Sequence, residues 1–230
     1  MTKAKAKRAK RGKATAAKAK SAAPKLYKVL GPNGECIHGG GTRAAFSWSL
    51  PVDGNPGAWV EAEGPLEPCN NGLHLTTEPV IWMKSGGRVF EAEVASNEPR
   101  LACDAPDKFC VRRARLVREL TGAKLVHLRI FSDGVHVVSG GACFASGSAT
   151  VKAWGSATVK ASDSATVEAW GSATVEAWDS ATVICRRGYW FGNALKIGVN
   201  DRAIWVDQRG DKTRVVGSSG EWTAPKEARA

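Results

Sequence analysis

The sequence predicts an α+β N-terminal domain followed by an all-β solenoid, preceded by a basic tail. An eight-residue unit recurs without gaps from residue 147 to residue 183, and a fixed period of this kind is typical of stacked repeat architectures. Upstream, short alternating apolar segments are separated by Gly- and Pro-rich stretches, as in a compact domain of mixed secondary structure. The predicted divisions are a tail (1–25), an α+β domain (26–122), the β-solenoid (123–218) and a C-terminal tail (219–230).

Nearly all of the net charge lies in the first 25 residues. The formal net charge is +11, from 33 Lys+Arg and 22 Asp+Glu, and residues 1–25 hold ten of the basic residues and no acidic one. The remaining chain, with 23 basic and 22 acidic residues, is therefore almost neutral. After Met1 this segment has no large apolar side chain to offset its ordering entropy, so we expect a disordered tail.

Such a run of like charge either binds a polyanion such as nucleic acid or only keeps the protein in solution. The residues expected to bind nucleic acid are Lys3, Lys5, Lys7, Arg8, Lys10, Arg11, Lys13, Lys18 and Lys20.

The location expected from the sequence is the cytoplasm. No stretch approaches the ~18 apolar residues of a membrane helix, and no apolar segment follows the charged N-terminus as in a secretory signal. Six cysteines in 230 residues are too sparse for a disulfide scaffold. We expect a protein that is not secreted, with its cysteines reduced.

The α+β domain is predicted from short elements. Arg88–Ala95 alternates most clearly: Val89, Glu91 and Glu93 share one face of a strand. Cys110–Leu120 fits either a basic amphipathic helix or a strand and helix pair. The other predicted elements are strands at Leu26–Gly31, Ala58–Glu63 and within GLHLTTEP (72–79), and a short helical stretch at Pro79–Ser85.

The repeat predicts which side chains face inward. Each unit, as in GSATVKAW (147–154), has Ala, Val and Ala at its third, fifth and seventh positions, and these lie on one side of a strand. Thr, Lys or Glu, and Trp or Ser lie on the other side. The small inward residues suit a narrow interior, and Gly-Ser or Asp-Ser at the start of each unit supplies a turn.

Charge pairing favours two units, or sixteen residues, per coil. This length stacks Lys152 on Glu168, whereas an eight-residue coil would stack lysine on lysine. Opposite charges contribute about 0.2–1 kcal/mol per cross-strand pair. The same coil places Trp154 over Trp170, with Ser162 and Trp178 on the opposite face. An antiparallel meander with the same period is the alternative.

Several motifs of the second segment resemble a family of domains of unknown function from bacteriophage and bacterial proteins. The motifs are LYKVL, PCNNGLH (Pro68–His74), the WM that follows, RVFEAEV and DKFCVRRARLVREL (Asp107–Leu120). In that family such a domain often precedes β-solenoid repeats. The resemblance implies a phage or phage-like origin, hence the cytoplasm of a bacterial host, and it implies no activity.

The strand order also resembles, more distantly, that of ADP-ribosyltransferase-like domains. The resemblance implies NAD as cofactor and places Thr76 or Thr77 on the second catalytic strand, with Glu91 or Glu93 on the last. The sequence departs from that fold at the first strand, where Tyr27 and Lys28 stand in place of Arg or His, and His74 stands where some members have Tyr.

No metal site is predicted. Cys36 and His38, and Cys69 and His74, offer thiolate and imidazole ligands, but no C-x2-C spacing is present. Cys103 and Cys110 are too far apart in sequence to complete a set. Buried thiols and loop histidines are the favoured interpretation.

The function expected is that of a non-enzymatic structural or interaction protein. The solenoid would offer a contact surface to a protein partner, and the tail would bind nucleic acid non-specifically. The outward tryptophans are candidates for protein contact or for stacking on bases or sugars. An NAD-dependent ADP-ribosyltransferase-like enzyme with an accessory solenoid is the alternative. The partner-binding residues predicted are Trp154, Trp170 and Trp178.

Overall fold

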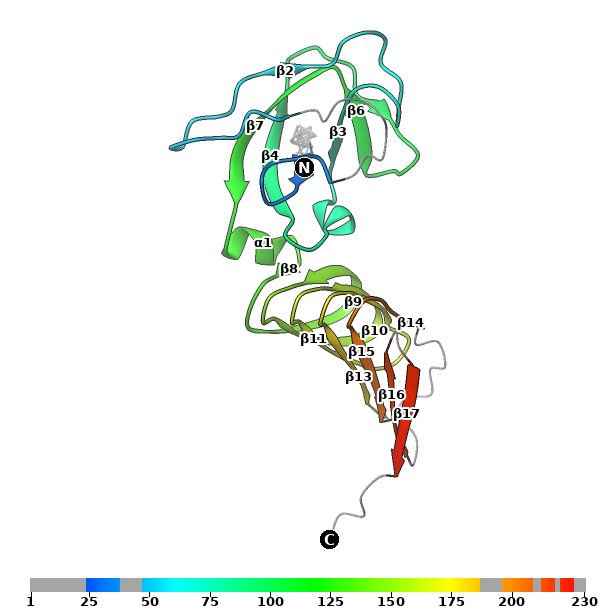
Figure 1. Ribbon diagram of the computed structural model, residues 1–230. Helices are drawn as coiled ribbons and strands as arrows, with labels where there is room; N and C mark the ends of the chain where they lie inside the picture. The colour runs from blue at the N-terminus through cyan, green and yellow to red at the C-terminus, as the bar shows by residue number, and fades with distance from the viewer. Residues whose placement is uncertain (1–23, 38–46, 187–195, 209–211, 218–219, 226–230) are drawn as a thin grey trace, which may run out of the picture.

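The computed structural model describes residues 24–37, 47–186, 196–208, 212–217 and 220–225. It has two parts, an antiparallel sheet at the N-terminal end and a solenoid that follows it (Figure 1). Within the described residues, no helix is both long and apolar enough to span a lipid bilayer.

The N-terminal domain is a seven-stranded sheet with the order β2-β7-β4-β1-β3-β6-β5. Every pair of neighbouring strands in it is antiparallel. The strands are β1 (Leu26–Leu30), β2 (Val60–Glu61), β3 (Leu73–Thr76), β4 (Arg88–Val94), β5 (Leu101–Ala102), β6 (Lys108–Val111) and β7 (Arg113–Leu120).

The predicted α+β class is wrong for this domain. Among its described residues, the only helical element is the four-residue 3₁₀ helix η1 (Pro79–Trp82); the single α-helix, α1 (Ala123–His127), follows the sheet. Cys110–Leu120, expected as an amphipathic helix or as a strand and helix pair, comprises the end of β6 and all of β7 and contains no helix.

A β-bulge explains the misleading pattern in β7. The register against β4 shifts between Glu91 and Ala92, which pair with Arg118 and Leu116. The extra residue turns the strand over, so Leu116 packs on one face of the sheet and Leu120 on the other. In the sequence these two leucines are four residues apart, a spacing that also fits one face of a helix.

Both faces of the sheet are covered. One face packs Leu26, Leu30 and Phe90 into the domain core together with Trp48. On the other face, Val29, Val80 and Val89 belong to a cluster that also contains Ile130 and Phe144, which come from the solenoid. The predicted alternation in β4, with Val89 opposite in direction to Phe90, is confirmed.

The solenoid is confirmed and is built from parallel strands. Thr150 pairs with Thr166 and Thr158 pairs with Thr174, so equivalent residues are sixteen apart, as predicted, and the antiparallel meander is excluded. The strands are β8 (Ile130–Phe131), β9 (Val135–Ala145), β10 (Thr150–Ala161), β11 (Thr166–Ala169), β12 (Thr174–Ala177), β13 (Thr182–Arg186), β14 (Lys196–Val199) and β15 (Ile204–Gln208).

The interior of the solenoid contains the small residues of the repeat. The inward Ala and Val side chains are entirely inaccessible to solvent, and where β10 pairs with β11 and β12, Val pairs with Val and Ala pairs with Ala. These fully buried residues are Ala149, Val151, Ala153, Ala157, Val159, Ala161, Ala165, Val167, Ala169, Ala173, Val175, Ala177, Ala181 and Val183.

The corners require left-handed backbone. Gly147, Asp163, Asp179 and Asp201 have φ values of 54–55° and occupy one corner of successive coils. Asp tolerates this conformation better than most residues. Each carboxylate also accepts a hydrogen bond from the corner backbone of the coil before: Gly147 N donates to Asp163 Oδ2 at 3.2 Å, and Asp163 N donates to Asp179 Oδ2 at 3.2 Å.

The C-terminal end is closed by two antiparallel strands, β16 (Lys212–Gly217) and β17 (Gly220–Pro225), the latter within the segment assigned to the C-terminal tail. Trp205 packs against the solenoid core and donates from Nε1 to Cys185 Sγ at 2.8 Å.

The tight interior generates a prediction. Ala169 is fully buried in β11, in register between Ala153 and Cys185. We expect Ala169→Leu to lower the free energy of unfolding by about 1–3 kcal/mol, because extra methylenes in a packed core force strain. Urea unfolding followed by circular dichroism measures this.

The matched control is Glu176→Leu, which adds leucine to an exposed outward position of β12. Its effect is expected to stay within about 0.5 kcal/mol. Equal effects of the two substitutions would contradict the two-sided coil.

Candidate functional site

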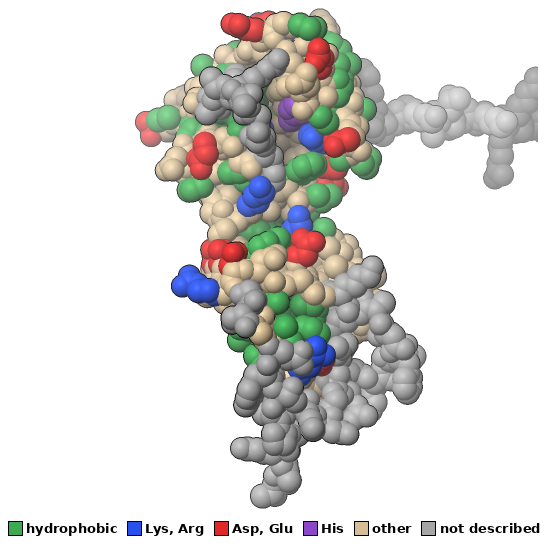
Figure 2. All heavy atoms as spheres, turned by 45° about the vertical axis from the view of Figure 1, so that its right-hand side comes forward, with side chains coloured by type: hydrophobic (Ala, Val, Ile, Leu, Met, Phe, Trp, Pro, Cys, Tyr) green, Lys and Arg blue, Asp and Glu red, His purple; other side chains and the backbone are tan. Residues whose placement is uncertain are grey.

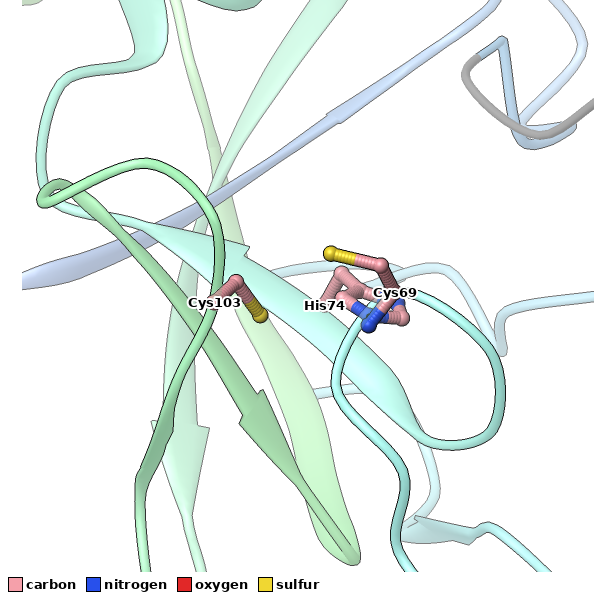
Figure 3. Close-up of side chains that lie close together, drawn as sticks. All are labelled: Cys69, His74 and Cys103. Atoms are coloured by element: carbon pink, nitrogen blue, oxygen red, sulfur yellow. The ribbon is translucent and has the colours of Figure 1, made fainter.

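Three side chains with metal-ligating atoms meet at one edge of the N-terminal sheet. Cys69 lies in the loop before β3, His74 lies on β3, and Cys103 lies between β5 and β6 (Figure 3). Their candidate ligand atoms all lie within 4.8 Å of one another. Cys69 is exposed, whereas His74 and Cys103 are half-buried. We call these three residues the Cys–His cluster.

His74 is held as a neutral imidazole. Burial, assisted by the nearby ammonium groups of Lys108 and Lys28, lowers its pKa to about 4. The backbone N–H of Cys69 donates to His74 Nε2 at 3.0 Å, so this nitrogen carries a lone pair. A neutral ring with a lone pair is the form of histidine that binds metals.

Charged groups adjoin the Cys–His cluster. The Cys69 thiol donates to Asp104 Oδ1 at 3.1 Å, and Lys108 Nζ lies 3.3 Å from the same oxygen and 3.5 Å from Cys69 Sγ. Burial raises the pKa of Cys103 to about 11, and the neighbouring Cys69 contributes. In the absence of a metal, the Cys103 thiol therefore stays protonated.

The sequence did not indicate this grouping. Cys69 and His74 are close in sequence and offer two ligands, but Cys103 lies 34 residues from Cys69. Pairing of β3 with β6 and of β6 with β5 brings them together, since Cys110 lies between His74 and Leu101. No local sequence signal reports that pairing. Cys36 is not in the cluster, and His38 lies outside the described residues.

The candidate catalytic residues of the ADP-ribosyltransferase-like alternative form hydrogen bonds or ion pairs with residues outside that candidate set. Thr76 Oγ1 donates to Asp107 Oδ2 at 2.6 Å, and Trp82 Nε1 donates to the same oxygen at 2.7 Å. On β4, Glu91 pairs with Arg118 at 2.6 Å. In the same strand, Glu93 pairs with Arg115 at 2.7 Å.

Thr76 and the glutamates are not adjacent. Tyr27 on β1 pairs with Thr76 on one side and with Glu91 on the other, which separates these two by two strand spacings, or about 10 Å. ADP-ribosyl transfer stays a prediction that this geometry does not test.

A cavity of about 630 Å³ lies where the sheet domain meets the solenoid. Its lining includes Tyr27, Thr77, Glu78, His127 and Arg129, and does not include Thr76, Glu91 or Glu93. Burial raises the pKa of Tyr27, and the Glu91 carboxylate adds to the effect. The cavity is open to solvent, and we assign no ligand to it.

Two of the three predicted partner-binding tryptophans lie together. The rings of Trp154 and Trp170 stack with centroids 4.2 Å apart and an angle of 2° between their planes. Trp154 is 43% exposed. Trp178 follows β12, on the other side of the coil from β11, and does not join this stack.

The stack lies on one outward side of the solenoid, which we call the tryptophan face. This face comprises the outward side chains of the first halves of β9 and β10 and of β11, β13 and β15. Val135 and Val137 of β9 are 66% and 69% exposed on it, and Ile204 of β15 is exposed as well.

The opposite outward side, the docked face, carries the N-terminal domain. Phe144, at the end of β9, is buried in the cluster shared with the sheet. Lys160 Nζ donates to the carbonyl of Ile81 at 3.0 Å, and Ser85 Oγ donates to Asp163 Oδ1 at 2.8 Å.

The basic residues predicted to bind nucleic acid, Lys3 to Lys20, lie outside the described residues.

No known protein family model matches this chain, and neither the curated proteins nor the solved structures include a match to it.

The buried bond between Thr76 and Asp107 generates a prediction. Removing the hydroxyl in Thr76→Val leaves the Asp107 carboxylate with one fewer donor. A hydrogen bond to a charged group contributes about 1.5–3 kcal/mol, and we expect a loss of that size in chemical unfolding. Thr77→Val is the control, because its hydroxyl makes only a 3.4 Å contact with the Asp107 carbonyl.

NAD consumption separates this structural role from a catalytic one. We expect none from the full chain. Consumption that disappears in Glu91→Gln or Glu93→Gln would instead support the ADP-ribosyltransferase alternative.

Proposed function

We propose that this chain is a non-enzymatic structural or interaction protein of phage or phage-like origin. Its solenoid is a rigid spacer whose tryptophan face contacts a protein partner, and its basic N-terminal tail binds nucleic acid non-specifically. The observation that carries the proposal is the exposed Trp154–Trp170 stack beside exposed aliphatic residues on the tryptophan face.

The division of the two outward sides supports this proposal. The docked face is occupied by the chain's own N-terminal domain through Phe144, Lys160 and Asp163. On the tryptophan face, Val135 and Val137 remain more than half exposed. Contiguous exposed apolar side chains on a soluble domain are typical of interaction sites.

The stacking geometry favours a protein over a base or a sugar. Because Trp154 and Trp170 lie parallel at 4.2 Å, each ring already has one face covered by the other. Ring edges and the flanking aliphatic groups remain available, and these serve as anchors in protein interfaces. Lys152 and Glu168 lie opposite each other between these apolar groups and offer polar contacts of both signs.

The tail's role in the proposal follows from charge. On the face shown in Figure 2, Lys and Arg side chains are interspersed with Asp and Glu over the described residues, without one continuous basic patch. The excess of positive charge belongs to residues 1–25. A polyanion would relieve their mutual repulsion and release its condensed counterions.

The tail is tested by duplex DNA and RNA binding across a salt series. If about eight phosphates are neutralised, the slope of log K against log salt is near −7 for duplex DNA. A full-length variant with the nine predicted tail residues changed to Gln is expected to lose this binding. Equal binding by both proteins would remove the tether from the proposal.

The tryptophan face is tested with the double variant Trp154→Ser/Trp170→Ser, with Trp178→Ser as the matched control. The partner is first identified by capture from the producing cells and then purified. We expect the double variant to bind it at least tenfold more weakly, because truncating an anchor residue costs roughly 2 kcal/mol or more of binding free energy. The control is expected to bind normally. An equal loss of affinity in both variants, or no loss in either, would contradict the assignment of the partner contact to the tryptophan face.

A further inference from the structure

We propose that the Cys–His cluster is a structural zinc site, with Cys69, His74, Cys103 and Asp104 as its four ligands. Two thiolates and an imidazole form a donor set that suits Zn²⁺, and a carboxylate is an accepted fourth ligand. The proposal concerns the N-terminal sheet and is independent of the partner contact and of the tail.

The geometry needs only small adjustments. Tetrahedral zinc with Zn–S bonds near 2.3 Å places its two sulfur atoms about 3.8 Å apart. The ligand atoms of Cys69, His74 and Cys103 already lie within 4.8 Å of one another. Cys69 is exposed, so its side chain can move toward the other two by rotation.

Asp104 supplies the fourth position after rotation of its side chain, because its carboxylate is not among the atoms that lie within 4.8 Å of one another. It follows Cys103 directly in sequence, and its Oδ1 already lies 3.1 Å from Cys69 Sγ. Four protein ligands make a closed site, which is typical of structural zinc, whereas catalytic zinc keeps a position open for water. The site therefore predicts no hydrolytic chemistry.

The charges at the site balance. Two thiolates and the Asp104 carboxylate carry three negative charges, zinc carries two positive ones, and the ammonium of Lys108 supplies one more. That ammonium lies 3.5 Å from Cys69 Sγ and 3.3 Å from Asp104 Oδ1. Zinc displaces the thiol protons, since a coordinating thiol is deprotonated outright.

His74 is prepared for the ion. Its Nε2 holds a lone pair that accepts the Cys69 N–H at 3.0 Å. Zinc takes the place of this donor. Binding thus exchanges one neutral hydrogen bond for a metal bond and frees the Cys69 amide.

The ion would stabilise the edge of the sheet formed by the short strand β5. β5 has two residues and lies at the end of the strand order, next to β6. Zinc ties the loop before β3, β3 itself and the turn after β5 to one point. Metal binding of this kind adds directly to folding free energy.

The test uses the full-length protein, purified under reducing conditions and freed of metal with a chelator. We expect one Co²⁺ per chain, with the visible absorption of tetrahedral cobalt and a thiolate charge-transfer band, displaced by one Zn²⁺. Three variants are each expected to weaken zinc binding at least a hundredfold: Cys69→Ser, His74→Asn and Cys103→Ser. Substitution of a residue that only hydrogen-bonds to a ligand typically weakens metal binding by roughly ten- to a hundredfold, so a larger loss indicates a direct ligand.

Cys36→Ser is the matched control, because Cys36 is a half-buried thiol of the same domain outside the cluster. It is expected to bind zinc normally. Zinc should also raise the thermal midpoint of the wild type and of Cys36→Ser, but not of the three ligand variants, and far-ultraviolet circular dichroism checks that each variant is folded.

Three results would overturn the proposal: no metal bound by the reduced wild type, unchanged binding by the cluster variants, or a Cys69–Cys103 disulfide in protein taken directly from cells and examined by mass spectrometry. Asp104→Asn tests the fourth ligand separately. Unchanged zinc affinity and an unchanged cobalt spectrum in that variant would overturn the closed site.

Discussion

The solenoid depends on the parallel stacking of identical small residues across a narrow interior. Four inward residues of β10 are inaccessible to solvent, and each lies over an identical residue sixteen positions away: Val151, Ala153, Val159 and Ala161. Packing at this density leaves no room for a larger side chain. Large residues are therefore confined to the outward sides and the ends of the repeat, where Trp154, Phe144 and Trp205 are found.

The ends of a parallel stack expose apolar surface and unpaired strand edges, and other elements of this chain adjoin each end. At the first coil, Ile130 and Phe144 pack against the sheet domain through Val29 and Val80. At the last coil, two antiparallel strands follow β15. Because the sheet domain occupies only one outward side, the opposite side is the one that presents aromatic and aliphatic groups to a partner.

The least predictable parts of the molecule are those where strands distant in sequence pair. Leu116 and Leu120 are four residues apart, a spacing that also fits one face of a helix, and the bulge in β7 places them on opposite faces of the sheet. Cys103 likewise meets His74 only because β6 lies between their strands. Neither feature has a local signature, because both arise from pairing across the sheet.

The sequence by itself determined the repeat, the inward and outward sides, the sixteen-residue coil and the location of the excess charge. These follow from strand periodicity, from like and opposite charges at fixed spacing, and from composition, all of which act over a few residues. Tertiary structure decided the all-β character of the first domain, the side on which it docks and the grouping of Cys69, His74 and Cys103. Those depend on which strands pair, and pairing is chosen by the burial of whole faces rather than by any one segment.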